Sequence, residues 1–115
     1  MGVPKRHYIR ALQNFAYALA YDDSVKKAKQ LNEETSEEVL KQFILEKKGE
    51  ISDKEFYYLA GRATQCTINE AYEMGVDSLN AAAGGIVMFE EFITSTIAAS
   101  VRTRPMIAGN GNYSG

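Results

Sequence analysis

Apolar residues recur at intervals of three and four through most of this 115-residue chain. That spacing places them on one face of an α-helix, whereas a half-buried strand needs strict alternation. Four segments follow the pattern, at about residues 4–21, 35–48, 52–74 and 86–104. The sequence shows no internal repeat, no βαβ alternation and no heptad pattern long enough for a coiled coil. It therefore predicts an all-α fold, a small helical bundle of four main helices, with one additional short helical piece at about residues 25–31.

The longest predicted helix begins at Ser52 and reaches about Met74. Ser52 and Glu55 have the spacing of a capping box, in which the serine oxygen accepts a backbone N–H and the glutamate reaches back to the N-cap N–H. Ile51 and Phe56 stand where a hydrophobic staple fixes the entering chain. The side chains expected to point inward are Phe56, Leu59, Ala60, Ala63, Cys66, Ala71 and Met74.

Sequence signals mark both ends of the helix that precedes it. Thr35 and Glu38 form a second capping box, and Gly49 suits the position after the last turn. The expected buried stripe consists of Val39, Leu40, Phe43 and Ile44.

Glycines and a proline divide the C-terminal half. Gly75 favours a helix break over a continuous helix, and the pair Gly84-Gly85 predicts a hinge. Beyond that hinge, residues 86–101 form a strongly apolar last helix. Pro105 is expected to end it, because a proline disfavours helical geometry at the preceding residue.

The chain length fits one helical domain, residues 1–105, followed by a Gly/Asn-rich tail, residues 106–115, that we expect to be flexible. A lone Cys66 cannot form an intrachain disulfide, which is compatible with a reducing compartment. No apolar run approaches the length of a membrane span, and the first residues contain no signal-peptide stretch. We therefore expect a cytoplasmic protein without membrane contact.

The charges are unevenly distributed, although the formal net charge is only −2. Acidic residues are absent from residues 1–21 and 102–115, and they concentrate in residues 22–55. The two ends instead carry the basic residues Lys5, Arg6, Arg10, Arg102 and Arg104. These ends could converge into one patch that attracts phosphate, or they could be solvated termini.

Signals for catalysis and metal binding are weak. His7 is the single histidine and lies in a basic first turn that we expect to be exposed, so a dyad with Cys66 would have to join two distant positions. Cys66 is better explained as a small buried side chain. One Cys and one His cannot supply the four ligands of structural zinc, and a solvated face explains Glu70, Glu73 and Asp77. We expect neither an enzyme nor a bound cofactor or metal.

Arg62 is the most suggestive single residue. With Tyr57 and Tyr58 nearby, it could stack on or pair with a phosphate-bearing partner, or it could form an intramolecular ion pair with an acid such as Glu55. Gly61 beside it weakens a helix by roughly 1 kcal/mol relative to alanine. A glycine at this position indicates close packing by a neighbouring helix or contact with a partner.

The stretch Phe56-Tyr57-Tyr58-Leu59-Ala60-Gly61-Arg62 resembles the aromatic-Tyr-x-Ala-Gly-Arg segment on a helix of the small subunits of CRISPR effector complexes, which act in antiviral defense. The all-helical character and the length of the chain are similar to that family as well. The resemblance implies a non-enzymatic subunit, present in several copies, that contacts nucleic-acid backbone through basic residues and neighbouring subunits through apolar faces. It covers about seven residues of 115, and only Gly61 and Arg62 correspond by position.

Two hypotheses follow. The leading one is a non-enzymatic subunit of a nucleoprotein assembly that contacts the backbone of RNA or DNA through Lys5, Arg6, Arg10, Arg62, Arg102 and Arg104. The alternative is a protein-interaction module, such as a viral or regulatory adaptor or a structural subunit, whose last helix presents Phe89, Phe92 and Ile93 to other protein subunits. Arginines gathered on one face would favour the first hypothesis, and scattered arginines would favour the second.

Overall fold

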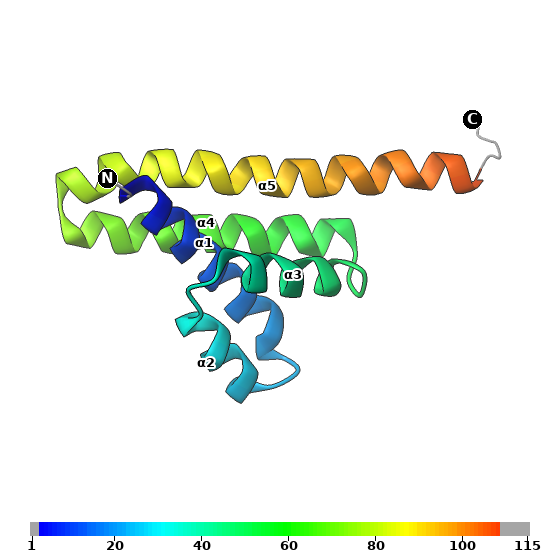
Figure 1. Ribbon diagram of the computed structural model, residues 1–115, viewed down its shortest axis with the longest axis horizontal. Helices are drawn as coiled ribbons and strands as arrows, with labels where there is room; N and C mark the ends of the chain where they lie inside the picture. The colour runs from blue at the N-terminus through cyan, green and yellow to red at the C-terminus, as the bar shows by residue number, and fades with distance from the viewer. Residues whose placement is uncertain (1–2, 109–115) are drawn as a thin grey trace.

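The computed structural model is an all-α bundle, so the predicted fold class is confirmed (Figure 1). It describes the backbone of residues 3–108 and the side chains of residues 4–99. Within these residues the helices are α1 (Val3–Tyr21), α2 (Val25–Glu33), α3 (Glu37–Lys48), α4 (Asp53–Met74) and α5 (Val76–Ala108). The short predicted piece is the full helix α2, which makes the count five rather than four.

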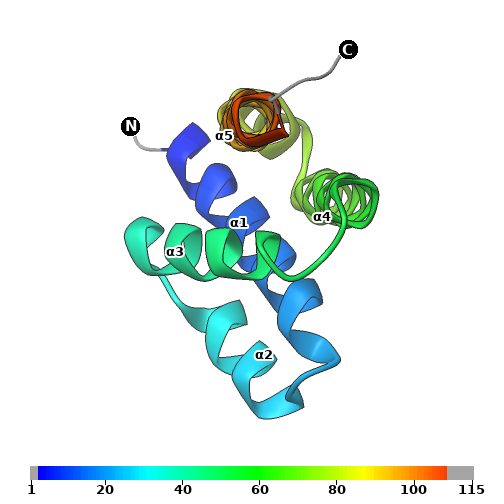
Figure 2. The ribbon, with the colours of Figure 1, turned by 90° about the vertical axis from the view of Figure 1, so that its right-hand side faces the viewer.

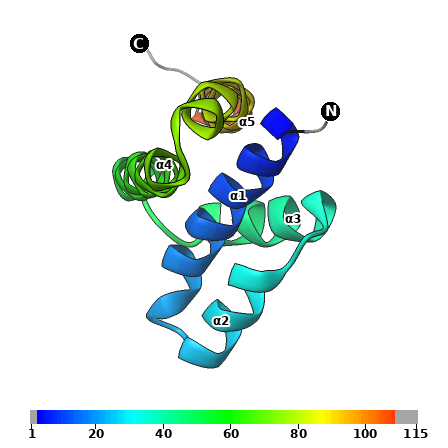
Figure 3. The same cartoon turned by 90° about the vertical axis from the view of Figure 1, so that its left-hand side faces the viewer.

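Helix α1 is the centre of the bundle and contacts each of the other four helices. Figures 2 and 3 show α4 and α5 side by side along one flank of α1, with α3 and α2 on the other. Phe15 of α1 makes edge-on ring contacts with Phe56 of α4 and Phe89 of α5, at centroid distances of 5.0 and 5.7 Å. Such pairs add to the stabilisation from apolar burial, so this trio joins three helices at the core.

Serine side chains cap the starts of α2, α3 and α4. The predicted start at Ser52 is confirmed, because its Oγ accepts the Glu55 backbone N–H at 3.0 Å. The predicted cap at Thr35 is wrong by one residue: Ser36 Oγ accepts the Val39 N–H instead. The Ser36 N–H itself donates to the Glu34 carboxylate at 3.1 Å, which holds the serine in the capping position.

The buried face of α4 differs from the prediction at Cys66, because the next residue along the helix faces the core instead. Thr67 is buried there, and Cys66 is exposed. The Thr67 hydroxyl can enter the core because it donates a 2.8 Å hydrogen bond to the Ala63 carbonyl. Met74 and, on α3, Val39 were also expected inward but are exposed. The correctly predicted inward residues of α4 are Phe56, Ala60, Ala63 and Ala71.

The break at Gly75 is confirmed, and the hinge at Gly84-Gly85 is wrong. Gly75 has a φ of 115°, which reverses the chain between α4 and α5. At Gly84-Gly85 helix α5 is continuous, and the first turns of α1 pack directly on it. A Cβ on Gly85 would lie 2.6 Å from the Pro4 carbonyl oxygen and 2.7 Å from the Tyr8 nitrogen. The glycine therefore allows two helix backbones to meet.

Because of this continuity, α5 is the longest helix, at 33 residues against 22 for α4. It also continues past Pro105, where we expected it to end, although a proline inside a helix removes one backbone hydrogen bond and crowds the preceding turn. The predicted tail therefore begins as helix, and residues 109–115 lie outside the described residues.

The last turns of α5 project beyond the bundle (Figure 1). Thr94 of α5 shares a groove with Tyr57 of α4, and the two helices run antiparallel. The start of α4 is therefore level with about residue 98. Roughly ten further residues of α5, or about 15 Å at 1.5 Å per residue, extend past it.

Part of α5 has the composition of a membrane span. The segment Val76–Ala99 is long and apolar enough to cross a membrane, by length and composition alone, and 28% of it is buried inside the fold. Our expectation that no apolar run approaches this length is therefore corrected. The buried side of the segment packs into the bundle through Ala82, Ile86, Phe89 and Ile93.

Candidate functional site

The predicted basic residues whose side chains the structure describes lie on α1 and α4. Lys5 pairs with Glu37, with Nζ and Oε1 3.1 Å apart. Arg6 is exposed on α1 and Arg62 is exposed on α4, while the side chains of Arg102 and Arg104 lie outside the described residues. Among the described side chains, Arg10 lines one cavity with Arg6 and another with Arg62, whereas Lys5 pairs with Glu37 of α3.

Arg10 forms hydrogen bonds within the fold. Its Nε and Nη2 donate to the two carboxylate oxygens of Glu70 at 2.8 and 2.9 Å, and its Nη1 donates to Gln13 and Asn32. The hydrogen bonds from Arg10 hold the pKa of Glu70 below its ordinary value, despite partial burial. The pair joins α1 to α4, and little of its donor capacity is left for a phosphate.

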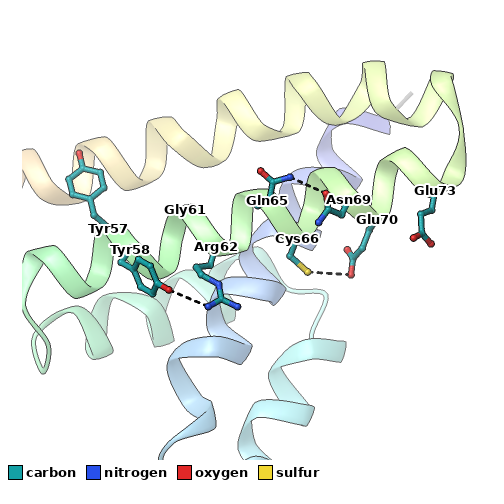
Figure 4. Close-up of a pocket in the computed structure, with 9 residues that line it drawn as sticks. All are labelled: Tyr57, Tyr58, Gly61, Arg62, Gln65, Cys66, Asn69, Glu70 and Glu73. Carbon is teal, nitrogen blue, oxygen red and sulfur yellow. Dashed lines mark hydrogen bonds between the residues drawn. The ribbon is translucent and has the colours of Figure 1, made fainter.

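The exposed side of α4 carries the residues that the sequence singled out (Figure 4). Tyr57 is 50% exposed and Tyr58 is 59% exposed. Arg62 Nη1 donates to the Tyr58 hydroxyl at 3.3 Å, and its guanidinium lies 5.9 Å from the ring centroid. The intramolecular partner of Arg62 is thus a tyrosine rather than the expected Glu55. We call Tyr57, Tyr58, Gly61 and Arg62 the α4 face.

Gly61 has no packing role in this fold. A Cβ at this position would meet nothing within 4 Å among the described residues. The expectation that a neighbouring helix approaches Gly61 is therefore wrong, and the close approach occurs at Gly85. The helix carries a weakening glycine that the described fold does not need.

The three apolar residues expected at a protein interface belong mainly to the core. Phe89 is fully buried and Ile93 nearly so, while Phe92 is half-buried with Lys41 Nζ 5.1 Å from its ring centroid. These side chains are turned inward because α5 packs on both α1 and α4. Phe89 and Ile93 nevertheless form the floor of a groove of about 240 Å³ between α4 and α5, with Tyr57 among the residues that line it.

The clefts around the α4 face are not basic. A cleft of about 660 Å³ over its outer side contains Arg62 together with Glu70 and Glu73 (Figure 4). A second cleft, of about 670 Å³ between α1 and α4, contains two arginines and three carboxylates: Arg10, Arg62, Asp22, Glu55 and Glu70. In each cleft the carboxylates outnumber the arginines by one, which disfavours a phosphate backbone.

The two candidate catalytic residues have environments opposite to those expected. His7 is buried and Cys66 is exposed. Burial and the Glu70 carboxylate raise the pKa of the Cys66 thiol, which reduces the thiolate at neutral pH. His7 and Cys66 line different clefts. Within the described residues, no group of three or more His, Cys, Asp or Glu side chains could hold a metal ion.

Comparisons with known proteins give no match: no protein-family model, no curated protein and no solved structure is similar to this chain. The resemblance to the CRISPR small subunits therefore stays a prediction based on the stretch from Phe56 to Arg62.

Proposed function

We propose that this chain is a non-enzymatic protein-interaction subunit that binds another protein through the α4 face and the groove beside it. The observation that carries the proposal is Gly61: it lies one helical turn after the exposed Tyr57 and Tyr58, and a Cβ added there would meet nothing within 4 Å among the described residues. A glycine lets a partner approach the helix backbone closely, and the described fold supplies no other reason for it.

The residue types of the α4 face support a protein partner. Tyrosine and arginine are enriched among the residues that contribute most to protein–protein affinity, because they bury large areas and keep a polar end. Tyr58 and Arg62 already hold each other in place, which lowers the entropy lost on binding. The adjoining groove lies between α4 and α5 next to this polar pair, and the exposed Tyr57 is among the residues that line it.

The electrostatics favour this proposal over the nucleic-acid hypothesis. Lys5 and Arg10 are in ion pairs, and the arginine of the α4 face stands among carboxylates. Affinity for nucleic acid depends mainly on unpaired positive charge facing the phosphates. The protein partner is accordingly a surface with apolar and basic groups, and we place the complex in the cytoplasm.

The sharpest test is the substitution Gly61→Gln. Glutamine is a better helix former by roughly 0.5–1 kcal/mol and meets no neighbour in the fold, so the melting temperature should stay equal or rise. Its side chain would obstruct a partner that sits close to the α4 backbone. The tagged protein is captured from its source cells, and the partner protein identified on the wild type should be lost from Gly61→Gln.

The matched control is Leu45→Gln on α3, which changes a 48% exposed helical residue away from the α4 face. It should retain the partner. Retention of the partner by both Gly61→Gln and the double variant Tyr57→Ala/Tyr58→Ala would overturn the proposal. Two outcomes would favour the nucleic-acid hypothesis instead. One is dissociation of the complex on nuclease treatment; the other is loss of the partner from Arg6→Glu/Arg62→Glu while Gly61→Gln retains it fully.

A further inference from the structure

His7 is enclosed where α1 crosses α5. Its side chain is 4% exposed, and its Cβ would lie 2.8 Å from a Cβ on Gly85. The Tyr8 nitrogen and the Pro4 carbonyl lie equally close to that position. The base of the His7 side chain therefore lies against Gly85 of α5, and the side chain also lines a cavity between α1 and α4.

One ring nitrogen of His7 has no partner. Nε2 is buried, and no described residue forms a hydrogen bond with it. A neutral imidazole can leave one nitrogen as an unpaired acceptor, but the protonated ring carries an N–H on both nitrogens. Protonation would thus bury a charged N–H donor that has no acceptor. Burial of an unpaired charge costs far more free energy than burial of an unpaired neutral nitrogen.

The charge of Arg6 reinforces this preference, although two carboxylates line the adjoining cavity. Arg6 is its chain neighbour, and burial followed by the Arg6 charge lowers the pKa of His7 from its model-compound value of 6.5. The adjoining cavity of about 770 Å³ also contains Arg10 and, from α4, Glu70 and Glu73. Glu70 is already paired with Arg10.

The opposing segment of α5, residues 81–88, contains no titratable side chain. It offers no carboxylate that could neutralise an imidazolium facing it. The charged state of His7 therefore finds no compensation on the α5 side of the contact.

We propose that His7 is a pH-sensitive contact: the neutral ring holds the first turns of α1 against Gly84-Gly85 of α5, and protonation releases them. The direction of the pH dependence follows from the linkage between proton binding and folding. The folded state disfavours the proton, so this contribution to stability is complete above pH 6.5 and is lost as the pH falls below it. The partly exposed carboxylates Glu37 and Glu70 have an ordinary pKa of 4.5, so the stability that they contribute is lost in a lower pH window.

NMR titration gives a direct test, because His7 is the only histidine and its ring signals need no assignment. We expect a titration midpoint below 6.5 in the folded protein and at about 6.5 in urea. Over the same range, amide hydrogen exchange in the first two turns of α1 should accelerate by up to about tenfold per pH unit beyond the intrinsic change. A folded midpoint at or above 6.5 would overturn the proposal.

The variants His7→Asn and His7→Phe separate the titration from the packing. Both remove the titrating group, so the unfolding constant, which should rise in the wild type between about pH 7 and pH 5, should stay level in either variant that folds. An equal rise in a folded variant would assign the pH dependence to other groups and refute the role of His7. Should neither variant fold, the wild-type titration and exchange data still decide the question.

Discussion

Arg10 of α1 and Glu70 of α4 form a two-point ion pair, with Nε–Oε1 and Nη2–Oε2 distances of 2.8 and 2.9 Å. Two parallel hydrogen bonds between a guanidinium and a carboxylate fix the relative position of the helices as well as attracting the charges. Both side chains are about one-third exposed, so solvent weakens the pair without removing it. The same pair removes Arg10 from the cations that a nucleic acid could meet.

We expect Arg10→Ala to lower the free energy of unfolding by about 1–2 kcal/mol, because it removes the guanidinium that donates to both Glu70 and Asn32. Urea denaturation of the single variants Arg10→Ala and Glu70→Ala and of the double variant isolates the coupling energy. Arg62→Ala serves as the control and should stay within about 0.5 kcal/mol of the wild type, as an exposed substitution. A coupling energy near zero would show that the pair is incidental.

The two glycines Gly85 and Gly61 should respond oppositely to alanine. Gly85→Ala forces a methyl group to within 3 Å of the α1 backbone and should destabilise the fold by about 1–3 kcal/mol. Gly61→Ala meets no neighbour and should stabilise it by up to about 1 kcal/mol. Thermal and urea denaturation of both variants check this, and similar effects at the two positions would contradict the helix contact described here.

The capping serine of α4 gives a local prediction. Ser52→Ala removes the acceptor for the Glu55 N–H and should cost about 1 kcal/mol of stability. Ser52→Asp keeps an acceptor and places a negative charge at the helix N-terminus, so it should retain most of the wild-type stability. Chemical denaturation of both variants measures the difference, and a loss in Ser52→Asp as large as in Ser52→Ala would argue against capping.

Acid should weaken the contact between α1 and α3. Tyr8 donates to the Glu37 carboxylate at 2.8 Å, and this bond, with help from Lys5, lowers the pKa of Glu37. Its contribution is therefore present above the ordinary pKa of 4.5 and is lost as the pH falls below that value. Glu37→Gln should show a smaller loss of stability between about pH 5 and pH 3. Tyr8→Phe should reduce the loss in the same way, because it removes the principal cause of the shift.

Cys66 provides a chemical probe of the α4 face. It is exposed, yet burial of its thiol and the nearby Glu70 carboxylate raise its pKa. A thiol-specific reagent at about pH 8 should therefore react more slowly with the folded protein than with the chain in urea. A faster reaction in the folded state would contradict the raised pKa. A bulky label at this single cysteine, one helical turn from Arg62, should also interfere with the proposed partner.

Local signals predicted the helix boundaries at Ser52 and Gly75 well and the glycines inside helices poorly. Ser52 and Gly75 act through neighbours in the sequence, so a few residues suffice to recognise their roles. Gly61 and Gly85 look equivalent in the sequence, and only the crossing of α1 and α5 distinguishes them. A flexible hinge and a close helix contact both call for glycine, and periodicity cannot separate the two.

The candidate site was predictable in its location but not in its environment. The aromatic residues and Arg62 do lie together on an exposed face, as helical spacing requires. The ion pair of Arg10 joins residues sixty positions apart, so no local pattern indicates it. The burial of His7 and of Phe89 likewise depends on which side of α1 meets α5, and that choice is made by packing of the whole bundle.

The central position of α1 affects how the chain can be made. Phe15 finds its ring partners in α4 and α5, which the ribosome synthesises much later than α1. Contacts this distant along the chain close only after the intervening segments exist, so the part of α1 that faces α4 and α5 stays uncovered until those helices are made, whereas α2 and α3 follow α1 directly. Folding is therefore expected as a late, cooperative step in which the final helix completes the core, and chaperones would have their longest access to the residues that end up deepest inside.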